Sequence, residues 1–140
     1  MTLETAKQLK ELGWDKETEK YCIGVIPIIV PNPAFNVTKE NLDNFKLGMT
    51  EDLRRLADNE TYPCPSLEEL LAVMPVGWND KITGAWYSFT MQKYFDKDEN
   101  IRYSLFYGNI NSEVIFHLTE TDPTEAVAML WAQLRKEGIV

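Results

Sequence analysis

The chain has 140 residues, of which 44% are apolar and 26% are charged. This is an ordinary globular composition, and it excludes a disordered or fibrous protein. At this length, folding buries roughly two-thirds of the surface of the unfolded chain, which is enough for one core. We therefore expect a single domain over residues 1–140.

Acidic residues outweigh basic ones and give a formal net charge of −8. Segment 40–69 alone carries eight acids against Lys46, Arg54 and Arg55. Nucleic acids are bound largely through Lys and Arg that neutralise phosphates, so no nucleic-acid partner is expected. No apolar run approaches membrane-spanning length, and the first residues lack the pattern of a signal peptide. We expect a cytoplasmic protein without a membrane partner.

The two cysteines, Cys22 and Cys64, are far apart and have no CxxC spacing or nearby histidine. This pattern predicts two buried, reduced thiols in place of a disulfide or a zinc site. The isolated glycines Gly77, Gly84 and Gly108 do not form a phosphate-binding loop. No cofactor and no metal site are therefore expected.

The first two predicted elements are a helix and an extended run. Residues 2–12 place Leu3, Ala6, Leu9 and Leu12 near one side, and a glycine follows where a helix would stop. Residues 21–30 are the most apolar, β-branched run of the chain. Because Pro27 interrupts this run, it predicts an edge strand or a buried extended arm.

Residues 32–64 are polar, and their structure is left open. Two short helices are indicated, one from Thr38 that includes Leu42 and Phe45, and one after Thr50. A loop of this length without any secondary structure would be unusual in a compact domain.

Two later helix starts are strongly marked. Ser66 is followed three residues later by Glu69, the pattern of a capping box, and Pro75 ends that helix. Asp122 precedes Pro123 and opens the last helix, which ends near residue 138. Its packing side consists of Ala126, Val127, Leu130, Trp131 and Leu134.

Between these helices, residues 82–119 predict three antiparallel strands. With turns over 96–100 and 109–112, alternation pairs Met91 with Leu105, Phe89 with Tyr107, Leu105 with Phe116 and Tyr103 with Leu118. One face is then apolar and contains Ala85, Tyr87, Phe89, Met91, Tyr103, Leu105, Tyr107, Val114, Phe116 and Leu118. The expected class is α+β, with a three- or four-stranded antiparallel sheet packed on one face by helices. Residues 21–30 are the candidate fourth strand.

The opposite face of this sheet carries the candidate ligand-binding residues Trp86, Tyr94, Arg102 and His117. In the same register, Tyr94 lies beside Arg102 and Ser104 lies beside His117. The polar groups of Tyr94, Arg102 and His117 can form directed hydrogen bonds, and the Trp86 indole can stack. Such a set is suited to an anionic or aromatic ligand. The favoured alternative is an ordinary half-solvated sheet face. His117 is the only histidine, and no nucleophile accompanies it in a recognisable pattern, so no catalytic residue is predicted.

Three segments, residues 3–13, 63–71 and 126–131, resemble small uncharacterised proteins encoded in phages and prophages, notably of gut Bacteroidetes. This resemblance implies a genomic context and no activity, and no functional residue is transferred from it.

Two functions from different classes follow from these observations. The favoured one is a non-enzymatic interaction module derived from a phage or prophage, which binds a protein partner or associates with itself. The alternative is a small-molecule-binding protein or enzyme that uses the face of Trp86, Tyr94, Arg102 and His117. A deep pocket there would favour the alternative, and a flat face would favour the module.

Overall fold

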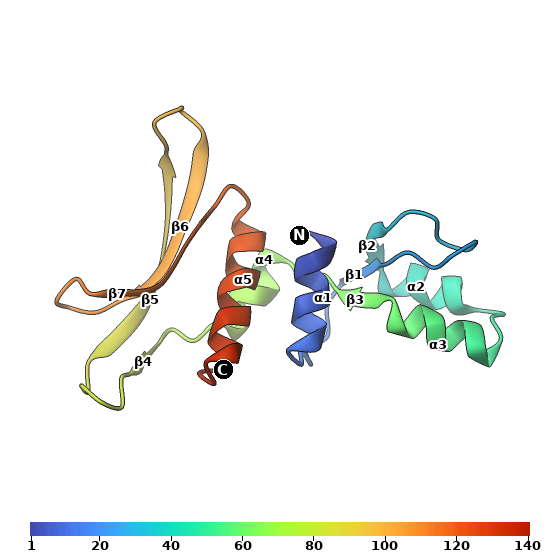
Figure 1. Ribbon diagram of the computed structural model, residues 1–140, viewed down its shortest axis with the longest axis horizontal. Coiled ribbons are helices and arrows are strands. Elements are labelled where there is room, and N and C mark those ends of the chain that lie inside the picture. The colour runs from blue at the N-terminus through green and yellow to red at the C-terminus, as the bar shows by residue number, and fades with distance from the viewer. The chain divides into compact units, whose positions relative to one another are not determined.

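A computed structural model describes the whole chain, residues 1–140. The chain divides into two compact units, Met1–Glu69 and Leu70–Val140. The first contains a three-stranded sheet and the second a four-stranded sheet (Figure 1). All strand pairs are antiparallel, and the expected α+β class is confirmed. The single domain over residues 1–140 stays a prediction.

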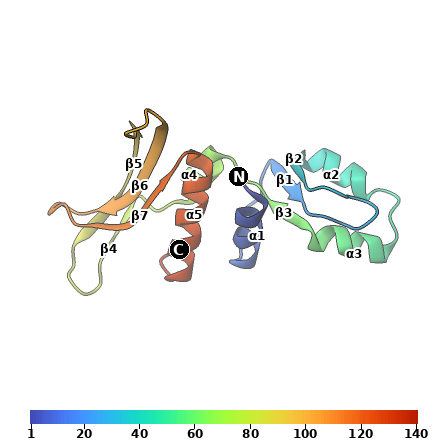
Figure 2. The same ribbon diagram turned by 45° about the horizontal axis from the view of Figure 1, so that its top comes forward.

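The first unit combines three helices with a small sheet. Its elements are α1 (Leu3–Glu11), β1 (Lys20–Ile23), β2 (Ala34–Thr38), α2 (Lys39–Lys46), α3 (Glu51–Asn59) and β3 (Thr61–Pro63). The strand order is β2-β1-β3. In Figure 2, α2 lies beside β1 and β2, the strands that it contacts. The strands β2 and β3 fall within the range that the sequence left open.

The helices α1, α2 and α3 each begin at a threonine cap. The hydroxyl groups of Thr2, Thr38 and Thr50 accept hydrogen bonds from the backbone N–H three residues later. Such a cap satisfies a donor that the helix itself leaves unpaired. The two short helices predicted after Thr38 and Thr50 are confirmed.

A lysine of α1 caps the C-terminal end of α3. Lys10 Nζ donates to the carbonyls of Asp58 at 2.8 Å and Thr61 at 3.0 Å, and it lies 5.1 Å from the centre of the Tyr62 ring. A cation at the C-terminal end of a helix interacts favourably with the helix dipole. This contact fixes α1 against the segment that leads into β3.

The two cysteines form a disulfide, so the prediction of reduced thiols is wrong. The Cα atoms of Cys22 and Cys64 are 6.0 Å apart although 42 residues separate them in sequence. The pairing of β1 with β3 places Cys22 opposite Tyr62, and Cys64 N donates to the carbonyl of Lys20 at 3.0 Å. Strand pairing therefore brings the two sulfur atoms together, and the spacing of the cysteines along the chain does not indicate this disulfide.

The apolar run 21–30 belongs to the first unit and does not extend the sheet of the second. Only its beginning is a strand, which ends at Ile23. Beyond Gly24 the chain turns, and Ile26 and Val30 bridge each other through N–H···O bonds in both directions. Pro27 sits inside this turn, where its lack of an N–H costs no ladder bond.

The second unit is a twisted sheet covered by a helix. Its elements are the end of α4 (Leu67–Val73), β4 (Gly77–Asn79), β5 (Trp86–Phe95), β6 (Ile101–Gly108), β7 (Val114–Glu120) and α5 (Pro123–Lys136). The strand order is β4-β5-β6-β7, and α5 packs against β6 and β7. Leu105 and Tyr107 of β6 are fully buried, as are Leu130 and Leu134 of α5. The fourth strand is β4, in place of residues 21–30, which the sequence offered as the candidate.

Both marked helix starts are confirmed. Glu69 N donates to Ser66 Oγ at 3.1 Å, and Ser66 N donates to Glu69 Oε1 at 3.0 Å. Asp122 Oδ1 accepts from Thr124 N at 2.9 Å. The predicted packing side of the last helix is buried throughout.

The first predicted strand register is confirmed, and the second is wrong. Met91 pairs with Leu105 and Phe89 with Tyr107, as expected. Leu105 pairs with Leu118, however, in place of Phe116, and Tyr103 pairs with Glu120.

Two local insertions explain the second register. The β6–β7 turn closes at Glu113, one residue later than predicted, through the bond from Asn109 N to Glu113 O at 3.0 Å. A bulge then adds a residue to β7 near Phe116, whose φ is 53°. The later turn pairs Ile115 with Tyr107 on the apolar face and Val114 with Gly108, and the bulge then shifts the pairs beyond it, such as Leu105 with Leu118.

Candidate functional site

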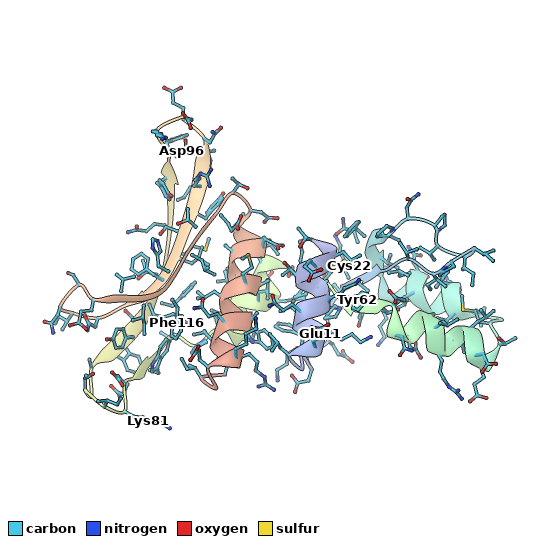
Figure 3. All side chains as sticks on the ribbon, viewed as in Figure 1. Glu11, Cys22, Tyr62, Lys81, Asp96 and Phe116 are labelled. Atoms are coloured by element: carbon cyan, nitrogen blue, oxygen red, sulfur yellow. A yellow bond between two sulfur atoms is a disulfide. The ribbon has the colours of Figure 1, made fainter.

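The β5–β6 hairpin reaches beyond the part of the sheet that α5 covers. Figure 1 shows its two strands extending past the end of α5, and Figure 3 shows Asp96 at its tip. Large apolar side chains are exposed in this part, with Phe95 exposed by 71%, Ile101 by 44% and Met91 by 36%. Phe95 and Ile101 pair directly across the two strands. The hairpin therefore presents apolar surface that the second unit leaves uncovered.

One edge of β5 is unpaired over its outer half. The short strand β4 pairs only with the stretch from Trp86 to Ser88, and Phe89 N donates to Val76 O at 2.9 Å on the same side. Alternate residues of an antiparallel strand direct their N–H and C=O groups to the same side. Met91, Lys93 and Phe95 therefore direct theirs away from β6, where no strand follows. We call these main-chain groups the open β5 edge.

The other sheet edges are blunted. A bulge at Phe116 interrupts β7, and Asn36 in β2 has a φ of 55° beside an irregular register. The strands β3 and β4 have three residues each, and β3 includes Pro63, which has no N–H. Proteins commonly protect edges by bulges, prolines and short strands. The outer half of β5 has no bulge and no proline, and its register with β6 is continuous from Ser88 to Phe95, so its protection is the charge of Lys93.

The side chains along the open β5 edge form a pattern of apolar, basic and apolar residues. Met91, Lys93 and Phe95 alternate in position, so they lie on one face, together with Tyr103 opposite Lys93. Lys93 is exposed and has no carboxylate partner. The edge thus combines free backbone groups, apolar surface and a cation.

The hairpin turn is held by one carboxylate. Asp96 Oδ1 accepts from the N–H groups of Asp98 and Asn100, both at 2.9 Å, and Oδ2 accepts from Arg102 Nε at 2.8 Å. The Arg102 hydrogen bond is the main reason that the pKa of Asp96 lies below its ordinary value. In return, this bond raises the pKa of Arg102. The tip of the hairpin is therefore ordered by its own side chains.

Three of the four predicted ligand-binding residues lie along one sheet face, and two of them, Arg102 and His117, are engaged with neighbours. Tyr94 pairs with Arg102, as expected, and Arg102 is bonded to Asp96. The His117 Nε2 lies 2.7 Å from Ser104 Oγ, and its ring meets the edge of Phe106 with centroids 5.9 Å apart. The expected proximity of Ser104 and His117 is thus found despite the altered register.

Trp86 is remote from the other three residues. It begins β5 and Tyr94 nearly ends it, so roughly 26 Å of strand separates them at about 3.3 Å per residue. A Cβ added to Gly77 would lie 2.7 Å from the Trp86 ring, which shows how closely the indole covers that glycine. The four residues therefore do not converge on one binding site.

No group of three or more His, Cys, Asp or Glu side chains is arranged to hold a metal ion. None of the helices is both long and apolar enough to cross a membrane.

Sequence reasoning missed the open β5 edge. The alternation of Met91, Lys93 and Phe95 was visible, but the end of the neighbouring strand β4 at Asn79 was not. An edge is defined by the strand that is missing beside it, and no local pattern in β5 records this.

No protein-family model, curated protein or solved structure matches this chain. The α+β class therefore rests on the structure itself, and the resemblance to phage and prophage proteins stays a prediction.

Proposed function

We propose that the protein is a non-enzymatic interaction module that binds an extended segment of a partner protein at the open β5 edge. The single observation that supports this function is the unpaired outer half of β5 beside the exposed side chains of Met91 and Phe95. The resemblance to phage and prophage proteins contributes a genomic context only.

Strand addition is a common way in which a sheet edge recognises a peptide. The main-chain groups of the peptide bond to the edge, and alternate side chains enter the surface beside it. Each such hydrogen bond contributes about 0.5–1.5 kcal/mol net, so a few bonds need apolar burial to give useful affinity. The exposed apolar side chains along β5 supply that burial.

A proline substitution distinguishes strand addition from other binding modes. The N–H of Lys93 points away from β6, so Lys93→Pro removes an edge donor and leaves the β5–β6 bonds in place. Lys93→Gln keeps the N–H and removes only the charge. It is therefore the matched control.

The experiment selects binders for the wild-type protein from a displayed library of random peptides. We expect the selected peptides to bind Lys93→Gln and to lose binding to Lys93→Pro. Amide exchange of Met91, Lys93 and Phe95 should slow in the complex. A library without any binder, or binders that tolerate the proline, would contradict the proposed function.

The ligand-binding alternative has less support. Arg102 already pairs with Asp96, and Trp86 is remote from Tyr94. It stays a prediction, which a screen of anionic metabolites against the wild type and Arg102→Ala tests. The absence of a nucleic-acid partner also stays a prediction.

The cellular location is a separate matter. A disulfide between Cys22 and Cys64 is typical of oxidising compartments, so it argues against the cytoplasmic location expected from the sequence. That location stays a prediction until the redox state of the protein is measured in cells.

A further inference from the structure

We propose, on the basis of the proposed function, that the strand added to β5 carries an acidic residue with an apolar residue two positions away on each side. The acidic residue pairs with Lys93, and the apolar residues pair with Met91 and Phe95. This inference names the chemistry of the partner segment.

The pleat of the sheet determines which side chains meet. Residues directly opposite each other in an antiparallel pair place their side chains on the same face. Met91, Lys93 and Phe95 share one face, so the residues paired with them also lie on it. They are alternate residues of the added strand, and the two residues between them lie on the other face, beside Gln92 and Tyr94.

The two apolar positions of the added strand follow from apolar side chains that are exposed along β5 and β6. Phe95 and its cross-strand neighbour Ile101 are both exposed, and Met91 lies at the other end of the same stretch. An apolar side chain opposite Phe95 would remove its ring from water, and one opposite Met91 would do the same for the thioether. Polar residues at these positions would leave the side chains of Phe95 and Met91 exposed to water.

The acidic position follows from charge. Lys93 lies between the two apolar positions, is exposed and has no carboxylate partner. The carboxylate nearest in sequence, Asp96, is bonded to Arg102. Opposite charges that face each other across strands stabilise the pair, and like charges destabilise it. An acidic residue is therefore the complement of Lys93.

A second copy of this chain is a poorer occupant. If two β5 strands paired symmetrically about Lys93, the two ammonium groups would face each other. If the pairing were centred on Gln92, each Lys93 would face the Met91 of the partner copy, and its charge would stay uncompensated. Lysine on an edge strand is a common protection against such self-pairing.

Four synthetic nonapeptides test the inference. The first has Leu-Thr-Glu-Thr-Leu at its centre, and the second and third replace its glutamate by glutamine and lysine. The fourth has the same composition as the first, with the glutamate moved by one position. Fluorescence anisotropy measures the binding of each to the wild type, Lys93→Glu and Lys93→Pro, after amide spectra have shown that each variant is folded.

We expect the glutamate peptide to bind the wild type at least five-fold more tightly than the lysine and shifted peptides, with the glutamine peptide between them. Lys93→Glu should reverse the preference between the glutamate and lysine peptides, and Lys93→Pro should bind none of them. Equal binding of all four peptides to the wild type, lost in Lys93→Pro, would overturn the acidic motif and leave the proposed function standing.

Two further outcomes would also overturn the motif. If none of the four peptides binds while the random library yields binders, the partner segment has another chemistry. If the wild type sediments as a dimer that Lys93→Pro dissociates, the occupant of the edge is a second copy.

Discussion

Arg102 donates a hydrogen bond from Nε to Oδ2 of Asp96 at 2.8 Å, which ties the start of β6 to the turn of the hairpin. The other carboxylate oxygen of Asp96 accepts two backbone N–H groups of the turn. The side chain that sequence analysis assigned to an anionic ligand thus already has an anion within the chain. The same pair orders the end of β5, where Phe95 borders the open edge.

The Asp96–Arg102 pair predicts a pH dependence of stability. The folded protein lowers the pKa of Asp96 below its ordinary value of 3.8, first through the Arg102 hydrogen bond and then through Asn100 N–H. The ionised carboxylate therefore stabilises the fold above the pKa of the unfolded chain, and this contribution is lost as pH falls through the lower, folded-state pKa. We expect Asp96→Asn to be less stable than the wild type at pH 7, and the difference to shrink below about pH 4.

Urea titrations at pH 7 and pH 3 measure this difference. Asp98→Asn is the control, because the Asp98 side chain accepts no hydrogen bond in the turn. A stability difference between the wild type and Asp96→Asn that is the same at both pH values would show that the carboxylate charge has no role.

The Cys22–Cys64 disulfide predicts a loss of stability on reduction. It closes a loop of 42 residues, and cross-links of this span restrict the unfolded chain by about 4 kcal/mol in the loop-entropy model, with smaller measured effects common. We expect the double variant Cys22→Ala, Cys64→Ala to lose about 2–4 kcal/mol of unfolding free energy. Denaturant titration with and without reductant measures it.

The controls separate the bond from the side chains. Reductant should destabilise the wild type and leave the double variant unchanged. Thiol labelling of the protein as isolated from cells should find both cysteines blocked. Two freely labelled cysteines, with no response to reductant, would contradict the disulfide and restore the expectation of reduced thiols.

The sequence predicted contacts between residues that are close along the chain, and it failed for contacts between distant segments. The Ser66–Glu69 cap and the Met91–Leu105 pair involve residues close along the chain, and their chemistry is visible in the pattern. The Cys22–Cys64 bond depends on the pairing of β1 with β3, which brings together distant segments. A single added residue in the β6–β7 turn, which closes at Glu113, was enough to move Ile115 to the apolar face. Local rules do not detect such an insertion.

The candidate site shows the same division. Alternation correctly placed Tyr94 beside Arg102, yet it did not indicate that the Arg102 guanidinium donates a hydrogen bond to Asp96. Nor did it show that β4 ends before Met91. Both facts depend on side-chain geometry or on a neighbouring strand, which alternation within one strand does not record.

The reciprocal cap at the start of α4 predicts the effect of two substitutions. Ser66→Ala removes the acceptor of Glu69 N–H, and Glu69→Ala removes the acceptor of Ser66 N–H. We expect Ser66→Ala to lose about 1 kcal/mol in a denaturant titration and Glu69→Ala to lose a similar or smaller amount. Glu68→Ala, a neighbouring acid outside this pair, is the control and should change stability less. Equal effects of all three would contradict the capping box.

We expect the substitution Ile28→Gly to stabilise the protein, because the backbone conformation of Ile28 suits glycine better than isoleucine. Its φ is 74°, Pro27 precedes it, and Ile29 N donates to Ile26 O at 3.1 Å. This is the pattern of a type II turn, whose third residue is usually glycine. A left-handed conformation costs an L-residue about 1–2 kcal/mol, and β-branching adds crowding. The Ile28 side chain is fully exposed, so no packing offsets that cost.

We expect Ile28→Gly to raise the unfolding free energy by about 0.5–1 kcal/mol, since the relief of strain exceeds the added entropy of an unfolded glycine, which is about 0.5–1 kcal/mol. Ile28→Asn should also be stabilising, because asparagine tolerates this conformation. The control is Ile29→Gly, at a position with ordinary φ and a partly covered side chain, which should be destabilising. Urea titration measures all three, and exchange of the Val30 amide, bonded to Ile26 O at 2.8 Å, reports on the turn itself. A less stable Ile28→Gly with faster Val30 exchange would show that the turn does not strain Ile28.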